Sequence, residues 1–221
     1  MGEAEFLPKL GERVPDFEAQ TTKGVIRFYD ILRQGFWVLL FSHPAPFTPV
    51  CTSEFIAFAQ NYNEFKKRGI FLLGLTVGTL ESQLAWIRSI KKSFGIDIPF
   101  PVIADYNMRI STMFNMYHPK ERELGTIRAT FIIDNKGIIR YISYYPNEIG
   151  RSIDELLRVI DALKYSLQYK VLIPANWKPG DKALAKLPEN INEIEARMKN
   201  PDYECLDWYY CYIIRRGEGE K

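Results

Sequence analysis

The chain has 221 residues, 47% of them hydrophobic, and a formal net charge of +2. This size and apolar content predict one sizeable core with a smaller appended segment. The charge is too small, and the basic residues are too evenly mixed with acidic ones, for a nucleic-acid-binding protein. No apolar run approaches the length of a membrane helix, and the charged first ten residues lack the apolar core of a signal peptide.

The cysteine count points to an intracellular protein. Three cysteines are an odd number, which does not fit the paired framework of a secreted domain. We therefore expect a cytoplasmic protein whose cysteines act as reactive thiols.

The first forty residues predict a hairpin followed by a buried strand. Segments 14–19 and 25–28 flank the turn residues 21–24, a pattern typical of a small hairpin at the entrance to a domain. The apolar run 36–41 then indicates a buried strand.

A cysteine follows this strand, in the first turn of a predicted helix that continues over 54–67. Thr48 is a good N-cap, and Pro49 suits the first helical position, where its missing N–H would be unpaired anyway. Cys51 is then the third helical residue, near unpaired backbone N–H groups and the positive end of the helix dipole. That setting favours the thiolate, which is the nucleophilic form. The alternative is a buried structural thiol.

Strands and helices alternate over the next hundred residues. We expect strands over 70–77, 129–134 and 138–143, and helices over 79–94, 108–114 and 153–169. Segment 99–104 is expected at a sheet edge, because prolines are poor central-strand residues. The apolar face of the 79–94 helix is expected to comprise Leu80, Leu84, Ile87 and Ile90. This order predicts an α/β fold, with a mixed central sheet and helices on both faces.

The amino-acid composition of the chain changes after residue 169. Prolines punctuate the segment, which has room for one short helix over 191–199, and the aromatic stretch 203–212 surrounds Cys205 and Cys211. We therefore expect a domain over 1–168 and a C-terminal arm over 169–221. Such an aromatic arm is expected to lie on its own domain or on a neighbouring subunit.

The residues around Cys51 suggest peroxide chemistry. A reactive thiolate needs cationic neighbours, and Arg128 and Arg151 are candidates, the alternative being that each is a solvated surface charge. The Thr48 hydroxyl can cap the helix and also donate to a sulfur or a bound oxygen. Together these residues suit a reaction in which the thiolate attacks the terminal oxygen of a peroxide and positive charge stabilises the leaving oxyanion.

The two tail cysteines favour a redox interpretation over a metal site. Only His43 and His118 accompany them, without zinc-ligand spacings, so we expect no metal. A sulfenic acid on Cys51 needs a second thiol to condense with, and a cysteine on the arm could supply it. The alternative is two unpaired thiols among packed aromatic rings. His43 either orients its loop or is a satisfied core histidine, and His118 is expected to be structural.

Residues 41–55, Phe-Ser-His-Pro-Ala-Pro-Phe-Thr-Pro-Val-Cys-Thr-Ser-Glu-Phe, resemble the active-site signature of the peroxiredoxins. The subfamily is the one that groups the one-cysteine enzymes with archaeal relatives. Further similar segments are 73–77, 126–134, 144–146, 150–158 and 174–181, so the resemblance runs from about Leu7 to Cys211. The spacing of the two tail cysteines is similar to that of archaeal members.

The resemblance implies a thioredoxin-like fold and a thiol-dependent peroxidase, for which we expect no cofactor, acting on hydrogen peroxide and small organic hydroperoxides. It also implies a homodimer that commonly assembles into a decamer of five dimers. Cys51 is the implied peroxidatic cysteine. Thr48, Arg128 and, less directly, Arg151 are its implied partners. Pro44 and His43 are expected to help bind the peroxide.

In archaeal relatives the resolving thiol comes from the C-terminal arm of the other subunit. That role maps onto Cys211, with Cys205 able to exchange with it, and a thioredoxin-type dithiol would regenerate the enzyme. The competing hypothesis is an oligomeric, chaperone-like holdase on the same fold. A disulfide oxidoreductase is disfavoured because Cys51 has no Cys-x-x-Cys partner, and the absence of a Gly-x-Ser-x-Gly motif argues against the lipid hydrolase activity of some relatives.

Three departures from the family pattern affect loops rather than catalytic groups. Pro46 stands where Asp is usual and stiffens the loop before Cys51. The usual Val-Asp-Ser after the second strand is here Val77-Gly78-Thr79, and Gln83 replaces the His of a His-x-x-Trp pattern. We expect these changes to alter turnover and loop dynamics rather than the reaction.

Overall fold

The structure is a computed structural model that describes residues 8–116 and 125–214. The chain divides into two compact units, with the division between Ile153 and Asp154. The expected role of His118 lies outside the described residues.

A seven-stranded mixed sheet forms the centre of the first unit. Its strands are β1 (Glu18–Thr21), β2 (Gly24–Arg27), β3 (Trp37–Ser42), β4 (Ile70–Thr76), β5 (Val102–Ala104), β6 (Arg128–Ile133) and β7 (Ile139–Tyr145). Their spatial order is β2-β1-β5-β4-β3-β6-β7. Strands β3, β4 and β5 run parallel, whereas the remaining pairs are antiparallel. The prediction of a mixed sheet is confirmed.

One expectation about the sheet is confirmed and another is wrong. The N-terminal hairpin forms from β1 and β2, and it joins the main sheet because β1 also pairs with β5. Strand β5 is not an edge, since it lies between β1 and β4. The prolines at 99 and 101 precede the strand instead of interrupting it, so they remove no ladder hydrogen bond from it.

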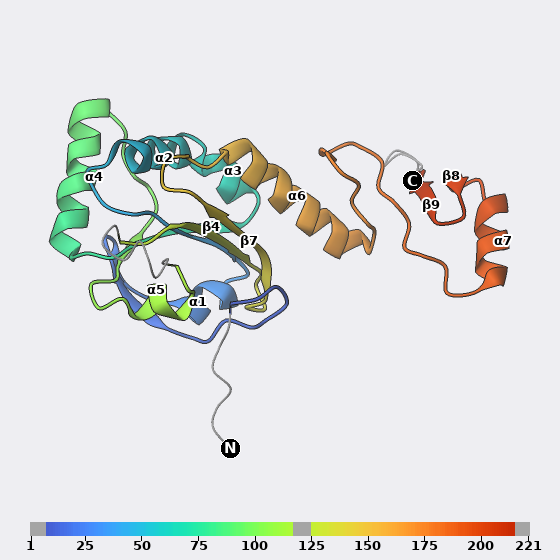
Figure 1. Cartoon of the computed structure of the whole chain (residues 1–221), viewed down its shortest axis with the longest axis horizontal. Helices are drawn as coiled ribbons and strands as arrows, with labels where there is room; N and C mark the ends of the chain where they lie inside the picture. Colours follow the sequence, from blue (N-terminus) through green and yellow to red (C-terminus); the bar gives the residue numbers. More distant parts are fainter. Residues whose placement is uncertain (1–7, 117–124, 215–221) are drawn as a thin grey trace, which may run out of the picture. The chain divides into compact units, whose positions relative to one another are not determined.

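Helices cover both faces of this sheet. They are α1 (Phe28–Arg33), α2 (Pro49–Gln60), α3 (Tyr62–Lys67), α4 (Leu80–Phe94) and α5 (Arg109–Met113). Figure 1 shows α2 and α3 on one side of the sheet and α1 and α5 on the other. The helix expected to start at Pro49 and continue over 54–67 starts where predicted, but it is divided into two helices, α2 and α3.

Alternation along the strands builds a separate core on each face. Val38 and Leu40 of β3 belong to the buried cluster that includes α1 and α5 residues. Phe41, one position on, points to the opposite face. There its ring lies 5.8 Å from the ring of Phe55 and 4.2 Å from that of Phe58, both on α2. The aromatic packing fixes α2 against the end of β3.

The expected apolar face of α4 is wrong in part. Ile90 is buried as expected, and Leu80 and Ile87 are partly buried, but Leu84 is 46% exposed. Gln83 and Trp86 are buried instead, because burial of the large Trp86 indole outweighs burial of one leucine.

The second unit contains α6 (Ile153–Tyr169), α7 (Ile191–Lys199), β8 (Tyr203–Asp207) and β9 (Tyr210–Ile213). Trp177 is 2% exposed, its ring lies 5.1 Å from that of Tyr165, and its carbonyl accepts a hydrogen bond from Arg158 Nη1 at 3.1 Å. The extended segment 183–185 pairs with β9, which ties the aromatic tail to its own unit.

Within the two described ranges, no helix is long and apolar enough to span a membrane. The same residues contain no group of three or more His, Cys, Asp or Glu side chains placed to hold a metal ion.

Candidate active site

Cys51 lies where the sheet passes into α2, as predicted. Helix α2 starts at Pro49, so Cys51 is its third residue. Thr48 is the N-cap residue with extended backbone angles, but its side chain makes no capping hydrogen bond within the described chain. The hydroxyl instead donates to the carbonyl of Ala45 at 2.9 Å. The prediction of the cap position is therefore confirmed, and that of the capping hydroxyl is wrong.

Arg128 brings a cation to the sulfur. Cys51 is fully buried, and Arg128 Nη1 donates to its Sγ at 3.4 Å. Nε and Nη2 of Arg128 donate to the carbonyl of Asn147, at 3.1 Å and 2.8 Å. With its other nitrogens held by a backbone carbonyl, the guanidinium presents Nη1 to the sulfur in one fixed direction.

Arg151 is also buried but does not contact Cys51 in the described structure. Its Nη1 donates to the carbonyl of Ala129 at 3.0 Å, and its Nη2 to the carbonyl of Ser42 at 2.9 Å. Its guanidinium lies 5.1 Å from the centre of the Phe41 ring. The alternative that Arg128 and Arg151 are solvated surface charges is wrong, because both side chains are at most 2% exposed.

Glu54 forms ion pairs with both arginines, a role that was not predicted from the sequence. One carboxylate oxygen, Oε2, accepts from Arg128 Nη1 and from Arg151 Nη2, each at 2.7 Å. The other, Oε1, accepts from Arg151 Nε at 2.8 Å and from its backbone N–H at 2.9 Å. Glu54 is three residues after Cys51 on α2, so the two share a helix face, and that spacing was the available signal.

The charge balance of this cluster is positive. Burial of Glu54 opposes its ionisation, but hydrogen bonds and charge from Arg151, and then the charge of Arg128, offset burial and lower the pKa of the carboxyl. Two arginines and one carboxylate leave one net positive charge beside the Cys51 sulfur. Such a charge is what a thiolate nucleophile and a leaving oxyanion require.

His43 is a buried neutral imidazole. Its ring lies 4.8 Å from the ring of Phe55 and 5.0 Å from that of Trp86. Burial first, and then the charges of Arg151 and Arg128, lower the pKa of His43 to about 3. The Ala45 backbone only partly opposes that shift, and the ring nitrogens make no hydrogen bond of normal geometry to the described residues. The ring is thus a core group, but not a satisfied one.

The backbone of residues 43 and 44 carries the positioning role proposed for His43. The His43 carbonyl accepts hydrogen bonds from Thr76 Oγ1 at 2.9 Å and from Thr126 Oγ1 at 2.7 Å. Gly125 passes so close that a Cβ there would lie 2.3 Å from the Pro44 carbonyl oxygen. Its φ of +86° is also one that glycine adopts most easily. Glycine therefore lets the segment that leads into β6, the strand of Arg128, approach the loop that leads into α2, the helix of Cys51.

The replacements at 78 and 83 lie together. A Cβ at Gly78 would be 3.6 Å from Gln83 Nε2. Gln83 is fully buried, and its amide oxygen and nitrogen have no hydrogen-bond partner in the described part of the chain. Pro46, the third replacement, is partly exposed in the loop before α2. None of the three contacts Cys51 in the described structure.

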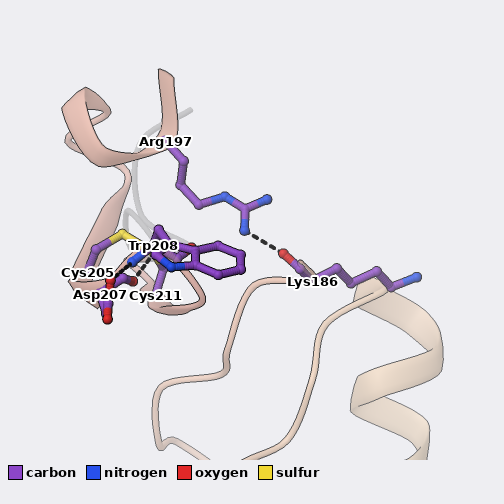
Figure 2. The surroundings of a disulfide bond; sticks show 6 residues. All are labelled: Lys186, Arg197, Cys205, Asp207, Trp208 and Cys211. Carbon is purple, nitrogen blue, oxygen red and sulfur yellow. Dashed lines mark hydrogen bonds between the residues drawn. A yellow bond between two sulfur atoms is a disulfide. The ribbon is translucent and has the colours of Figure 1, made fainter. Parts of the chain in front are cut away.

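The tail cysteines form a disulfide with each other. Cys205 and Cys211 are opposite residues of β8 and β9, with Cα atoms 4.0 Å apart (Figure 2). The alternative of two unpaired thiols is therefore wrong. Cys51 is the free cysteine of the chain.

Comparisons with protein families place these sites in a known context. Residues 10–142 match the model of the AhpC/TSA family, and residues 162–196 match that of the C-terminal domain of 1-Cys peroxiredoxin. A relative named Peroxiredoxin 2, from Caldanaerobacter subterraneus subsp. tengcongensis, is 50% identical over 207 residues, which cover 93% of each chain. A Peroxiredoxin from Aquifex aeolicus is 47% identical over 219 residues, covering 95% of this chain and 98% of its own.

Two solved structures are similar to this chain over most of its length. A yeast mitochondrial 1-Cys peroxiredoxin, studied for its thiol resolving mechanism via glutathione/thioredoxin systems, has a TM-score of 0.82 and 37% identity, with coverage of 93% of this chain and 98% of its own. A cysteine-to-serine mutant of Peroxiredoxin 6 of Arenicola marina has a TM-score of 0.83 and 34% identity, covering 95% and 99%. The fold is thioredoxin-like, as expected. The chain therefore belongs to the AhpC/TSA family and is a peroxiredoxin of the one-cysteine subfamily, a peroxidase that works through a cysteine thiol.

Proposed function

We propose that Cys51 is the peroxidatic cysteine and that it reduces hydrogen peroxide and small organic hydroperoxides. The Cys51 thiolate attacks the terminal peroxide oxygen, the O–O bond breaks, and Cys51 becomes a sulfenic acid. The remaining oxygen leaves as hydroxide or alkoxide and takes a proton to give water or an alcohol. The observation that carries this proposal is the 3.4 Å contact between Arg128 Nη1 and the Cys51 sulfur inside a buried cluster of net positive charge.

Thr48 and Arg128 are proposed to hold the peroxide from two sides. The Thr48 hydroxyl already donates its proton to the Ala45 carbonyl, so its lone pairs remain to accept a hydrogen bond from the peroxide O–H. Arg128 supplies N–H donors to the oxygen that develops negative charge. Pro44 and His43 shape the loop around the peroxide, His43 through its backbone. Arg151 acts as a positioning residue, because it reaches the sulfur only through Glu54 and Arg128.

The tail is proposed to complete the cycle. The sulfenic acid on Cys51 condenses with Cys211 of the partner subunit, forming an interchain disulfide and releasing water. Cys205 then attacks Cys211, frees Cys51 and closes the Cys205–Cys211 bond, which a thioredoxin-type dithiol reduces. The observed pairing of the two tail cysteines supports the exchange step, because it is the product of that step.

The assembly and setting belong to the same proposal. Residues 1–168 form the peroxidase domain and 169–221 a dimerisation arm, as in archaeal members of the subfamily. Five homodimers assemble into a decamer. A cytoplasmic location would supply the reduced dithiols that the cycle consumes.

Non-reducing mass spectrometry tests this cycle. Isotope-labelled and unlabelled chains are mixed and reassembled, the tail disulfide is reduced, and one equivalent of hydrogen peroxide is added. In a Cys205→Ser variant, which cannot carry out the exchange step, we expect Cys51–Cys211 peptides that join a labelled to an unlabelled chain, and in the parent chain we expect the Cys205–Cys211 bond to form again. A Cys211→Ser variant should form sulfenic acid on Cys51 and then stall. A stable sulfenic or sulfinic Cys51 with no linked peptide in the parent chain contradicts resolution by the tail and supports a one-cysteine cycle.

A further inference from the structure

The two sulfurs of the tail disulfide differ in access. Cys211 is 1% exposed, whereas Cys205 is partly exposed. The strands explain the difference. Strand β9 is an inner strand, because it pairs with β8 on one edge and with segment 183–185 on the other. In the described part of the chain β8 pairs only with β9, so Cys205 lies on the outer strand.

Backbone groups cover the inner sulfur. Cys211 Sγ lies 3.4 Å from the carbonyl oxygen of Asp207 and 3.8 Å from that of Trp208 (Figure 2). The Cys211 carbonyl also accepts a hydrogen bond from the Ala185 N–H at 2.9 Å. Thiol–disulfide exchange requires an attacking thiolate to reach one sulfur of the bond. The strand arrangement leaves Cys205 as the reachable one.

We propose that the protein dithiol that reduces the tail disulfide attacks Cys205 rather than Cys211. This inference rests on the proposed function, because it concerns how the tail is regenerated. It assigns the reaction with the reductant to Cys205, whereas Cys211 reacts with the sulfenic acid on Cys51 in the proposed cycle. The two tail cysteines thus have separate partners.

Reduction of the tail takes two thiol–disulfide exchanges. One thiolate of the reductant attacks Cys205 Sγ, the Cys205–Cys211 bond breaks, and Cys211 leaves as a thiolate that takes a proton from solvent. The second reductant thiol loses its proton and attacks the first reductant sulfur, and Cys205 leaves as a thiolate. The reductant becomes a disulfide, and the tail pair gains two electrons.

The turn beside Cys205 matches a protein reductant better than a small anionic thiol. Leu206 is 74% exposed, Trp208 44% and Tyr209 54%. Figure 2 shows the Trp208 indole extending from the turn next to the disulfide. A protein dithiol buries such apolar groups on docking, whereas glutathione is too small and too polar to cover them.

A trapping experiment tests the site of attack. The full-length Cys51→Ser protein, with its tail oxidised, is mixed with a thioredoxin whose second active-site cysteine is serine, and the reaction is quenched with acid. Peptide mass spectrometry should find at least about tenfold more thioredoxin linked to Cys205 than to Cys211, the ratio expected for one accessible sulfur. Linkage mainly to Cys211, or no linkage to Cys205, overturns the inference.

A kinetic experiment tests the docking turn. Reduction of the tail is followed in a Leu206→Ser/Trp208→Ala variant with intact thioredoxin, with glutathione and with dithiothreitol. The thioredoxin rate should fall about tenfold, as for loss of an interface anchor, and the dithiothreitol rate less than about twofold. Leu187→Ala, 60% exposed in the parent chain and outside the turn, is the matched control and should change neither rate. An equal fall with both dithiols, or faster reduction by glutathione than by thioredoxin, contradicts a protein reductant.

Neither experiment contains peroxide, so the proposed function and the inference about Cys205 can fail separately. If Cys51 does not react with peroxide, the proposed function fails while attack at Cys205 still stands. If thioredoxin links to Cys211, the inference fails and the peroxidase cycle remains.

Discussion

The two cysteine sites of this chain show how differently surroundings set thiol chemistry. Cys51 is enclosed by charged groups from distant parts of the chain, since Arg128 and Arg151 follow it by 77 and 100 positions. Cys205 and Cys211 are six positions apart on one hairpin, and their partners are backbone carbonyls and exposed aromatic rings. The first site depends on the whole sheet, whereas the second is built from local structure. Substitutions around Cys51 should therefore affect both catalysis and folding.

The largest expected effect comes from removing the Cys51 sulfur. Cys51→Ser should lower the rate of peroxide consumption by at least about a thousandfold, since no nucleophile of comparable reactivity replaces the thiolate. The measurement is stopped-flow peroxide consumption with dithiothreitol as reductant. Multi-turnover activity at the parent level would mean that the tail cysteines reduce peroxide by themselves, which would end the distinction between the two sites.

Arg128→Lys tests whether the geometry of the charged group beside Cys51 matters in addition to its charge. A lysine keeps the charge but cannot contact Cys51, Glu54 and the Asn147 carbonyl together, so the second-order rate constant for peroxide should fall by about a hundredfold. Arg140→Lys is the matched control, because Arg140 pairs with Asp134 and is 31% exposed. Its rate should stay within about twofold of the parent value. Equal losses in both variants would show that charge geometry at Cys51 is not decisive.

Glu54→Gln tests the dependence of the first site on the fold. The change leaves two buried guanidinium groups without their carboxylate, and the free energy of unfolding should fall by about 3–5 kcal/mol. Glu64→Gln removes an exposed carboxylate that pairs with Lys67 and Arg68, and should cost less than about 1 kcal/mol. Denaturant unfolding at pH 7 measures both. A loss below about 1 kcal/mol for Glu54→Gln would contradict a buried charge network.

The smallest expected effect is the pH dependence that His43 contributes between pH 6.5 and 5. Its pKa is about 3 in the folded chain, below the ordinary value of 6.5, so the unfolded chain binds the proton more readily in that range. The free energy of unfolding should therefore fall by about 2 kcal/mol from this group as the pH drops from 6.5 to 5. The lowered pKa of Glu54 acts in the same direction below pH 4.5. A His43→Gln variant should show a shallower loss between pH 6.5 and 5, and an unchanged slope would mean that His43 is not buried as a neutral ring.

The sequence predicted best what depends on neighbours along the chain. The position of Cys51 in the first turn of α2 follows from Thr48 and Pro49, and α6 and α7 have the expected bounds. These sequence patterns depend only on neighbouring residues, so they can be recognised without knowledge of tertiary contacts.

What the sequence did not predict depends on distant partners. Glu54 resembles any helical glutamate until Arg128 and Arg151 are placed against it. The exposure of Leu84 on α4 was not predicted, because the helix buries Trp86 instead, and hydrophobic periodicity alone does not weigh one large indole against a leucine. The pairing of Cys205 with Cys211 likewise requires the register of β8 and β9, which their spacing leaves open.

The shared arginine has a consequence for irreversible oxidation. A sulfinate spreads one negative charge over two oxygens, as the Glu54 carboxylate does. Arg128, which already holds that carboxylate at 2.7 Å and the sulfur at 3.4 Å, would bind a sulfinate on Cys51 through charge-assisted hydrogen bonds. Overoxidation should therefore tighten the first turn of α2, and the inactivated enzyme should unfold at a higher temperature than the reduced one.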